Sequence, residues 1–149
     1  MKTDEEQLMT VIDASGLILG RMASTVAKRL LSGESIVIVN SEKAVMSGKR
    51  LSRVKEARAF LEIGHPMKGP FHPRRPDQIV HRTVKGMLPH RQSRGEMALR
   101  RLRVFLGVPV RLKDASFQTI PEATVSKLRC SYVTVGDLAK EIGYKPLGE

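Results

Sequence analysis

The sequence contains very little cysteine, since Cys130 is the single one among 149 residues. One thiol excludes an internal disulfide and any cysteine-rich zinc site, which fits a protein of the reducing cytoplasm. Cys130 lies among residues that favour strands, such as Leu128 and Tyr132. We therefore expect a buried structural thiol rather than a catalytic nucleophile.

The sequence also lacks tryptophan, has only 4% aromatic residues and contains no long apolar run. Its longest purely aliphatic run covers residues 36–39, whereas a membrane-spanning helix needs about 20 apolar residues. The acidic residues Asp4, Glu5 and Glu6 are unlike the basic start of a signal peptide. We expect no membrane partner, and the scarcity of aromatic rings argues against single-strand readout on a stacking platform.

Negative charge is scarce in the middle of the chain. Over the whole sequence 26 Lys and Arg outweigh 15 Asp and Glu, which gives a net charge of +11. Residues 64–112 carry +9 and residues 14–63 carry +5, whereas residues 113–149 sum to zero. Such a density of one sign repels itself unless a polyanion neutralises it, so the middle of the chain is the expected nucleic-acid surface.

The first 40 residues predict a strand, a helix and a second strand. Residues 10–13 and 35–40 have the composition of strands, and residues 20–31 repeat apolar side chains at helical spacing. The unbroken apolar run at 36–39 is typical of a strand buried on both faces. Because such a unit crosses over right-handedly, it predicts an α/β fold with a parallel sheet, and the length suits one domain over residues 1–149.

Three further helices are predicted over residues 49–63, 76–88 and 94–106. In the first of them the apolar residues should face the core; these are Leu51, Val54, Ala57 and Leu61. Between the first two helices, residues 64–76 are rich in proline and glycine, which predicts an extended, stiffened loop.

The last third of the chain predicts shorter elements. Residues 117–120 and 128–133 have the composition of strands. A final helix is expected over residues 134–142, with Thr134 as its capping residue and Gly143 at its left-handed stop.

No motif for a cofactor, a metal or a nucleophile has its required spacing. Gly16 and Gly20 follow a strand without forming the dinucleotide fingerprint, and Gly48-Lys49 lacks the other residues of a phosphate-binding loop. The histidines match no zinc pattern; they are His65, His72, His81 and His90. We expect no cofactor, no metal and no small-molecule substrate, and the helix start at residues 47–50 is either a phosphate contact or a solvated turn.

The basic helix faces and the proline-stiffened loop supply the candidate contacts to nucleic acid. The loop is the sharpest feature, because its prolines hold the guanidinium groups of Arg74 and Arg75 forward at a reduced ordering cost. Cations dispersed over helices and a rigid loop suit a folded RNA recognised through its backbone. The candidate RNA-binding residues are Arg21, Lys28, Arg29, Lys49, Arg50, Arg53, Lys68, His72, Arg74, Arg75, Arg82, Lys85, Arg91, Arg94, Arg100, Arg101 and Arg103.

Several blocks of the sequence resemble, in order, the family of large-subunit ribosomal protein 13 in its archaeal form. They are Asp13-Ala14, residues 19–24, residues 40–45, residues 69–76, residues 82–89 and Arg94-Gly95. The resemblance implies a three-layer α/β/α fold around a small, mainly parallel sheet, and a non-enzymatic, cytoplasmic protein. Its partners would be large-subunit rRNA and neighbouring ribosomal proteins, and its role the assembly and stabilisation of the subunit.

Two other classes of function remain open from the residues alone. An α/β sheet commonly carries ligands at the carboxyl ends of its strands, so an enzyme acting on RNA or nucleotides is one alternative. A DNA-binding module is the other, although neither a dimerising seam nor a groove-reading arm is evident in the sequence.

Overall fold

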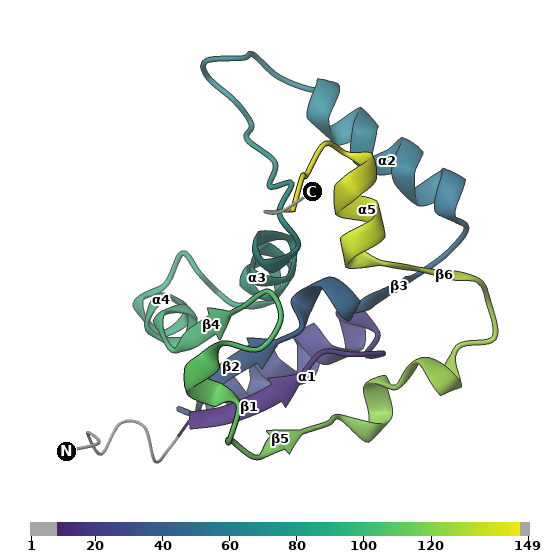
Figure 1. The fold of residues 1–149 in the computed structure, drawn as a ribbon. Coiled ribbons are helices and arrows are strands. Elements are labelled where there is room, and N and C mark those ends of the chain that lie inside the picture. The colour runs from purple at the N-terminus through teal and green to yellow at the C-terminus, as the bar shows by residue number, and fades with distance from the viewer. Residues whose placement is uncertain (1–8, 147–149) are drawn as a thin grey trace.

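The fold is built on a four-stranded parallel sheet, seen in a computed structural model that describes residues 9–146 (Figure 1). The strands are β1 (Met9–Asp13), β2 (Ser35–Val39), β4 (Leu102–Val104) and β5 (Phe117–Gln118), in the order β4-β2-β1-β5. All three pairings are parallel, and β1 and β2 pair over five residues. The acidic residues 4–6 lie outside the described part of the chain.

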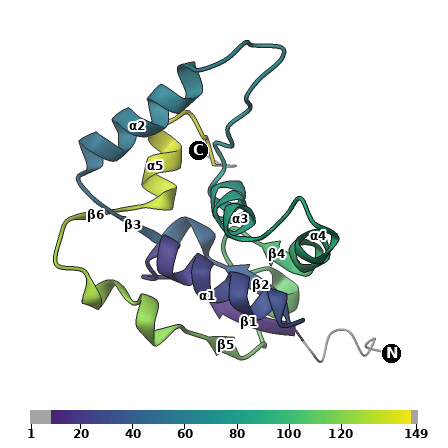
Figure 2. The same cartoon turned by 180° about the vertical axis from the view of Figure 1, so that it is seen from behind.

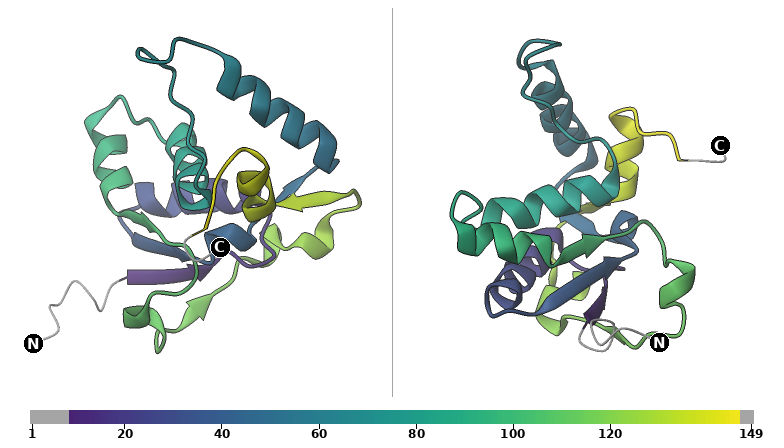
Figure 3. Two further views of the ribbon diagram at one scale, coloured as in Figure 1. Left: turned by 45° about the horizontal axis from the view of Figure 1, so that its top comes forward. Right: turned by 90° about the vertical axis from the view of Figure 1, so that its left-hand side faces the viewer.

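One face of the sheet is covered by three helices (Figure 3). The helix α1 (Leu19–Leu31) connects β1 to β2 and buries its apolar stripe, with Met22 and Val26 fully buried. Beside it lie α3 (Pro76–Met87) and α4 (Ser93–Arg100). These helices enclose Ile12, Ile36 and Ile38 in the main core, so the predicted strand-helix-strand unit is confirmed.

The opposite face is covered by the segment that follows β4. Val11, Val37 and Val39 form a second cluster there, packed by Phe105 and Leu112 among others. The only helical turn described in this segment is η3 (Val110–Leu112), of the 3-10 type. The expected α/β fold with a small parallel sheet is confirmed, and its second outer layer is this extended segment.

A second unit consists of a short two-stranded antiparallel sheet and two helices. Strand β3 (Val45–Ser47) pairs antiparallel with β6 (Tyr132–Thr134), and they lead into α2 (Arg50–Glu62) and α5 (Val135–Glu141). The amide of Asp137 donates to Thr134 Oγ1 at 3.1 Å, which confirms the predicted cap of α5. Three 3-10 turns complete the described elements: η2 (Ser41–Lys43), η4 (Pro121–Ala123) and η5 (Val125–Lys127).

The helix α2 and the following segment 63–75 form an arm set off from the central sheet (Figures 1 and 2). The expected apolar face of α2 is wrong in most positions, because only Val54 is buried. Leu51 is 85% exposed, and Ala57 and Leu61 are half-buried. The physical reason is that α2 packs mainly on α5 and β6, so most of its circumference faces solvent.

The predicted helix over residues 94–106 is wrong in its second half. α4 ends at Arg100, and residues 102–104 form β4 at the edge of the sheet. The amide of Ile36 donates to the carbonyl of Arg101 at 3.1 Å, and that of Phe105 donates to the carbonyl of Ile38 at 2.8 Å. The open edge of β2 needs these partners, and that need outweighs the helical spacing of the apolar residues.

Two expectations in the last third are also corrected. The predicted strand 128–133 is limited to Tyr132–Thr134, because the preceding residues have no neighbouring strand to pair with. Cys130 lies in that preceding segment and is exposed, so the expected buried thiol is wrong. The strand predicted at 117–120 is shortened to its first two residues, both exposed.

Gly95 provides a test of the packing around α4. A Cβ at this buried position would collide with the carbonyl group of Pro89, which belongs to the backbone and cannot rotate away. We expect Gly95→Ala to lower the free energy of unfolding by about 1–3 kcal/mol, measured by urea denaturation. The matched control is Gly86→Ala in α3, where a Cβ meets nothing within 4 Å and stability should be unchanged or higher. Equal stabilities of the two variants would contradict the packing described here.

Candidate nucleic-acid interface

The candidate cations lie on α1, on the arm, and on the segment that runs from α3 through α4 to β4. Most of their side chains are exposed. The half-buried exceptions are Arg29, Arg53, His72 and Arg101. Because α1 packs against α3 and α4, the outward surfaces of these three helices adjoin one another on one side of the sheet.

About half of the candidates have a side chain that makes no hydrogen bond or ion pair within residues 9–146. They are Arg21, Lys28, Lys49, Lys68, Arg74, Lys85, Arg91, Arg94 and Arg103. We call these nine residues the free cations. An exposed cation without an internal partner is available to an external anion at little desolvation cost, so the free cations are the strongest candidates for phosphate contact.

Two candidates serve the fold instead. Arg29 Nε donates to Glu34 at 2.8 Å, and its Nη2 lies 3.4 Å from oxygens of Thr10 and Gln118. Arg101 Nη2 donates to the carbonyl of Leu30 at 2.8 Å. The same carbonyl also accepts from the amide of Gly33 at 3.2 Å, so Arg101 adds a second partner at the C-terminus of α1. Both side chains therefore join the helix layer to the sheet.

A shared carboxylate holds the arm against α5. Glu141 accepts from Arg50 Nη2 at 2.6 Å and from Arg58 Nη2 at 3.3 Å. At the start of α2, Arg53 Nε donates to the carbonyl of Ser47 at 2.7 Å, and its Nη1 pairs with Glu56 at 3.1 Å. The arginines of α2 thus fix the direction of the arm as well as adding positive charge.

Hydrogen bonds and an ion pair fix the proline-rich loop of the arm at two places, at its tip and near its end. At its tip the amides of His65 and Gly69 each donate to the carbonyl of the other residue, at 3.0 and 2.9 Å. Near its end Arg82 Nη1 donates to the carbonyl of Phe71 at 3.2 Å, and Arg75 pairs with Asp77 at 3.0 Å. Arg74 between these ties is one of the free cations, and its guanidinium group lies beside Gly143 just after α5. That the prolines hold this group forward stays a prediction.

His81 adds little positive charge at neutral pH. Burial lowers the pKa of His81, the neighbouring Lys85 lowers it further, and Asp77 acts in the opposite direction. The His81 imidazole is therefore neutral at pH 7. In the part of the chain that the structure describes, no three His, Cys, Asp or Glu side chains gather in a metal-binding cluster. None of the described helices is long and apolar enough to cross a membrane.

Asp13, at the carboxyl end of β1, has a structural role. Asp13 Oδ1 accepts from Asn40 Nδ2 and from the amide of Ser15, both at 3.0 Å. Burial acts to raise the pKa of Asp13, but these hydrogen bonds outweigh it and the pKa lies below its ordinary value. The ionised carboxylate thus ties together the segments that follow β1 and β2.

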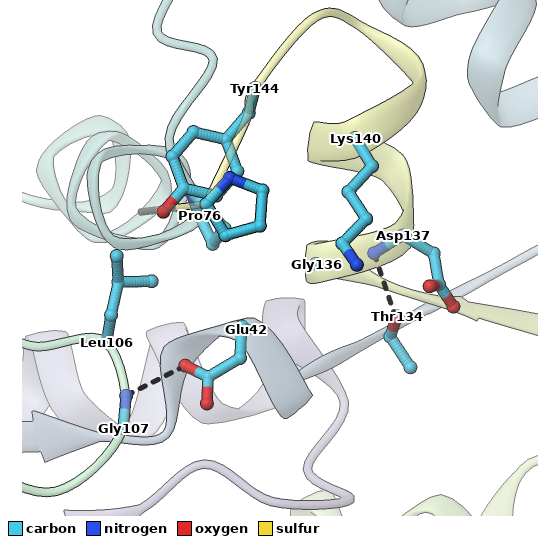
Figure 4. A pocket seen from close by; sticks show the side chains of 10 residues that line it. Glu42, Pro76, Leu106, Gly107, Thr134, Gly136, Asp137, Lys140 and Tyr144 are labelled. Carbon is cyan, nitrogen blue, oxygen red and sulfur yellow. Dashed lines mark hydrogen bonds between the residues drawn. The ribbon is translucent and has the colours of Figure 1, made fainter. Parts of the chain in front are cut away.

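The sequence did not indicate a pocket of about 560 Å³ between η2, the 106–107 turn and α5 (Figure 4). Glu42 accepts there from the amide of Gly107 at 3.0 Å, and Lys140 and Tyr144 line other walls. None of the candidate RNA-binding residues lines this pocket. Its residues come from four distant parts of the chain, so no local motif could reveal it.

Comparison with known proteins identifies the family. The model of the family described as Ribosomal protein L13 matches residues 7–111. The chain belongs to the ribosomal protein L13 family. The matched span runs from β1 to η3 and contains every candidate RNA-binding residue, so the resemblance noted in the sequence is confirmed.

Archaeal members of the L13 family match almost the whole chain. The protein named large ribosomal subunit protein uL13 of Methanosarcina barkeri is 52% identical over 139 residues, covering 92% of this chain and 99% of that protein. The protein of the same name from Methanococcoides burtonii is 48% identical over 138 residues, with the same coverage. That of Methanocaldococcus jannaschii is 43% identical over 142 residues, covering 92% and 99%.

Two adjacent residues of α1, Lys28 and Arg29, allow a structural cation and a free cation to be compared directly. Arg29→Ala removes a partly buried ion pair and should cost about 1 kcal/mol of unfolding free energy, whereas Lys28→Ala should leave stability unchanged. Lys28→Ala should instead weaken binding to transcribed archaeal large-subunit rRNA and reduce its salt dependence. Denaturation and filter binding on both variants check this. A stability loss in Lys28→Ala, or none in Arg29→Ala, would contradict the assignment.

Proposed function

We propose that this protein is a structural constituent of the large ribosomal subunit that binds folded large-subunit rRNA through phosphate contacts and supports subunit assembly. The observation that carries the proposal is the set of nine free cations on a scaffold whose other arginines are largely used internally. Membership of the L13 family supports it. The whole chain acts as one domain without catalytic chemistry, in the cytoplasm, beside neighbouring large-subunit proteins.

Phosphate contact explains why the free cations are spread rather than gathered in one cleft. An RNA backbone presents charge along its whole length, and each neutralised phosphate releases counterions, which favours binding. Cations on α1, on the arm and on the 82–103 segment can meet separate backbone stretches of one folded RNA. Arg74 lies two residues before α3 begins, with its guanidinium group beside Gly143 just after α5, so it adds a cation where the arm returns to the helices.

Charge removal at the loop tests the proposal. The double variant Arg74→Ala with Arg75→Ala should weaken binding to archaeal large-subunit rRNA and make the dependence of log affinity on log salt shallower by about one to two units. Folding should persist, because both side chains are exposed. Affinity is measured over a series of KCl concentrations.

The matched control removes two positive charges from a part of the chain outside the basic middle segment. Lys127 and Arg129 are exposed cations in the segment whose net charge is zero, and their replacement by alanine should change affinity and slope little. Equal effects of the two double variants would mean that only total charge matters. Equal affinity for duplex DNA and rRNA at moderate salt would favour a DNA-binding module, and a thermal shift with nucleotides would favour an enzyme.

A further inference from the structure

The arm encloses an apolar groove that none of the nine free cations lines. The groove has a volume of about 270 Å³ and lies between α2, the end of the proline-rich loop, α3 and α5. Its walls include the rings of Phe60 and His72, and the aliphatic side chains of Ile79 and Ile142. This volume is somewhat below that of sites for drug-sized ligands, so it suits a single flat ring system.

An exposed aromatic ring stands at the opening of this groove. Phe60 is 56% exposed, although it contacts His72 with ring centroids 5.5 Å apart. Exposing a large apolar ring beside an open apolar groove is unfavourable in water, so burial of both by a ligand would be favourable. A planar group stacked on Phe60 would cover the ring and fill the groove together.

The charges around the groove indicate which ligand would do this. Arg82 lines the groove, and only one of its guanidinium N–H groups is used by the carbonyl of Phe71. Arg74, a free cation, follows Pro73, which also lines the groove. On the α5 side the carboxylate of Glu141 is neutralised by two arginines. The site therefore offers a flat apolar surface next to positive charge, and a nucleotide supplies a planar base joined to a phosphate.

We propose that this groove binds one unpaired base of the large-subunit rRNA, stacked on Phe60, while Arg82 and Arg74 hold the adjoining phosphates. This inference rests on the proposed function and adds to it a place where the protein distinguishes an unstacked base from a helix. The proposed site uses a single aromatic ring on the arm. It therefore differs from the stacking platform of several aromatic rings on strands, which the scarcity of aromatic residues argues against. An apolar side chain of a neighbouring protein is the rival occupant.

The test compares two exposed phenylalanines of the arm. Phe60→Leu keeps apolar volume but removes the stacking ring, whereas Phe71→Leu removes a ring that is 72% exposed and does not line the groove. With purified protein and transcribed archaeal large-subunit rRNA, Phe60→Leu should weaken binding about tenfold, as expected for one lost base stack. The salt slope should not change, because no charge is removed. Phe71→Leu and Phe60→Tyr should bind like the wild type.

A second readout follows the base directly. If the stacked base is an adenine or a cytosine, dimethyl sulfate should find it protected in the wild-type complex and reactive with Phe60→Leu; carbodiimide probing covers uracil and guanine in the same way. Wild-type affinity of Phe60→Leu, or an equal loss in Phe71→Leu, would overturn the inference while leaving the proposed function in place. A defect seen only when other ribosomal proteins are present would also overturn it, in favour of a protein side chain. Failure of the wild type to bind rRNA at all would remove the proposed function itself.

Discussion

The burial of β2 on both faces is the constraint on which the rest of the structure depends. Residues 36–39 are almost completely inaccessible, and β2 has a parallel neighbour on each edge, β1 and β4. A strand in this position must find apolar cover on two sides and hydrogen-bond partners on two edges. The helices α1, α3 and α4 meet the first need on one face and the segment 105–115 meets it on the other.

That requirement also explains where the positive charge lies. With the interior apolar, the cations of residues 14–112 lie on outer helix surfaces, on the arm, and on turns and the edge strand beside them. There the available carboxylates fix the geometry of individual arginines. Glu141 fastens α2 to α5, Asp77 holds Arg75 near the start of α3, and Glu34 holds Arg29. The free cations are what remains after these uses. Fold stability and the proposed RNA affinity thus draw on different members of one basic set.

The elements that the sequence predicts well are those whose own burial pattern is long enough to show. The strand-helix-strand unit and α3 are of this kind, and two blocks of the family resemblance, residues 19–24 and 82–89, fall largely within their helices. The Thr134 cap was predictable for another reason, since it depends on one local hydrogen bond. β4 could not be predicted, because the spacing of Leu102 and Phe105 also suits a helix and only the open edge of β2 decides between them. The burial expected of Cys130 and Leu51 is wrong for a related reason: the exposure of a side chain depends on which distant element packs nearby. The groove beside Phe60 joins four separate segments and leaves no local signal.

The most direct test of the central claim is sucrose-gradient fractionation of a lysate of the source cells in a high-salt wash, with blotting for this chain. Salt weakens each phosphate contact, but a structural constituent held at many proposed contacts on α1, the arm and the 82–103 segment leaves only when all of them break together. The account therefore predicts that the protein stays with the large-subunit peak in stoichiometric amount. Presence only in the free pool would contradict the account of a structural ribosomal constituent and would favour an enzyme of nucleotides or RNA.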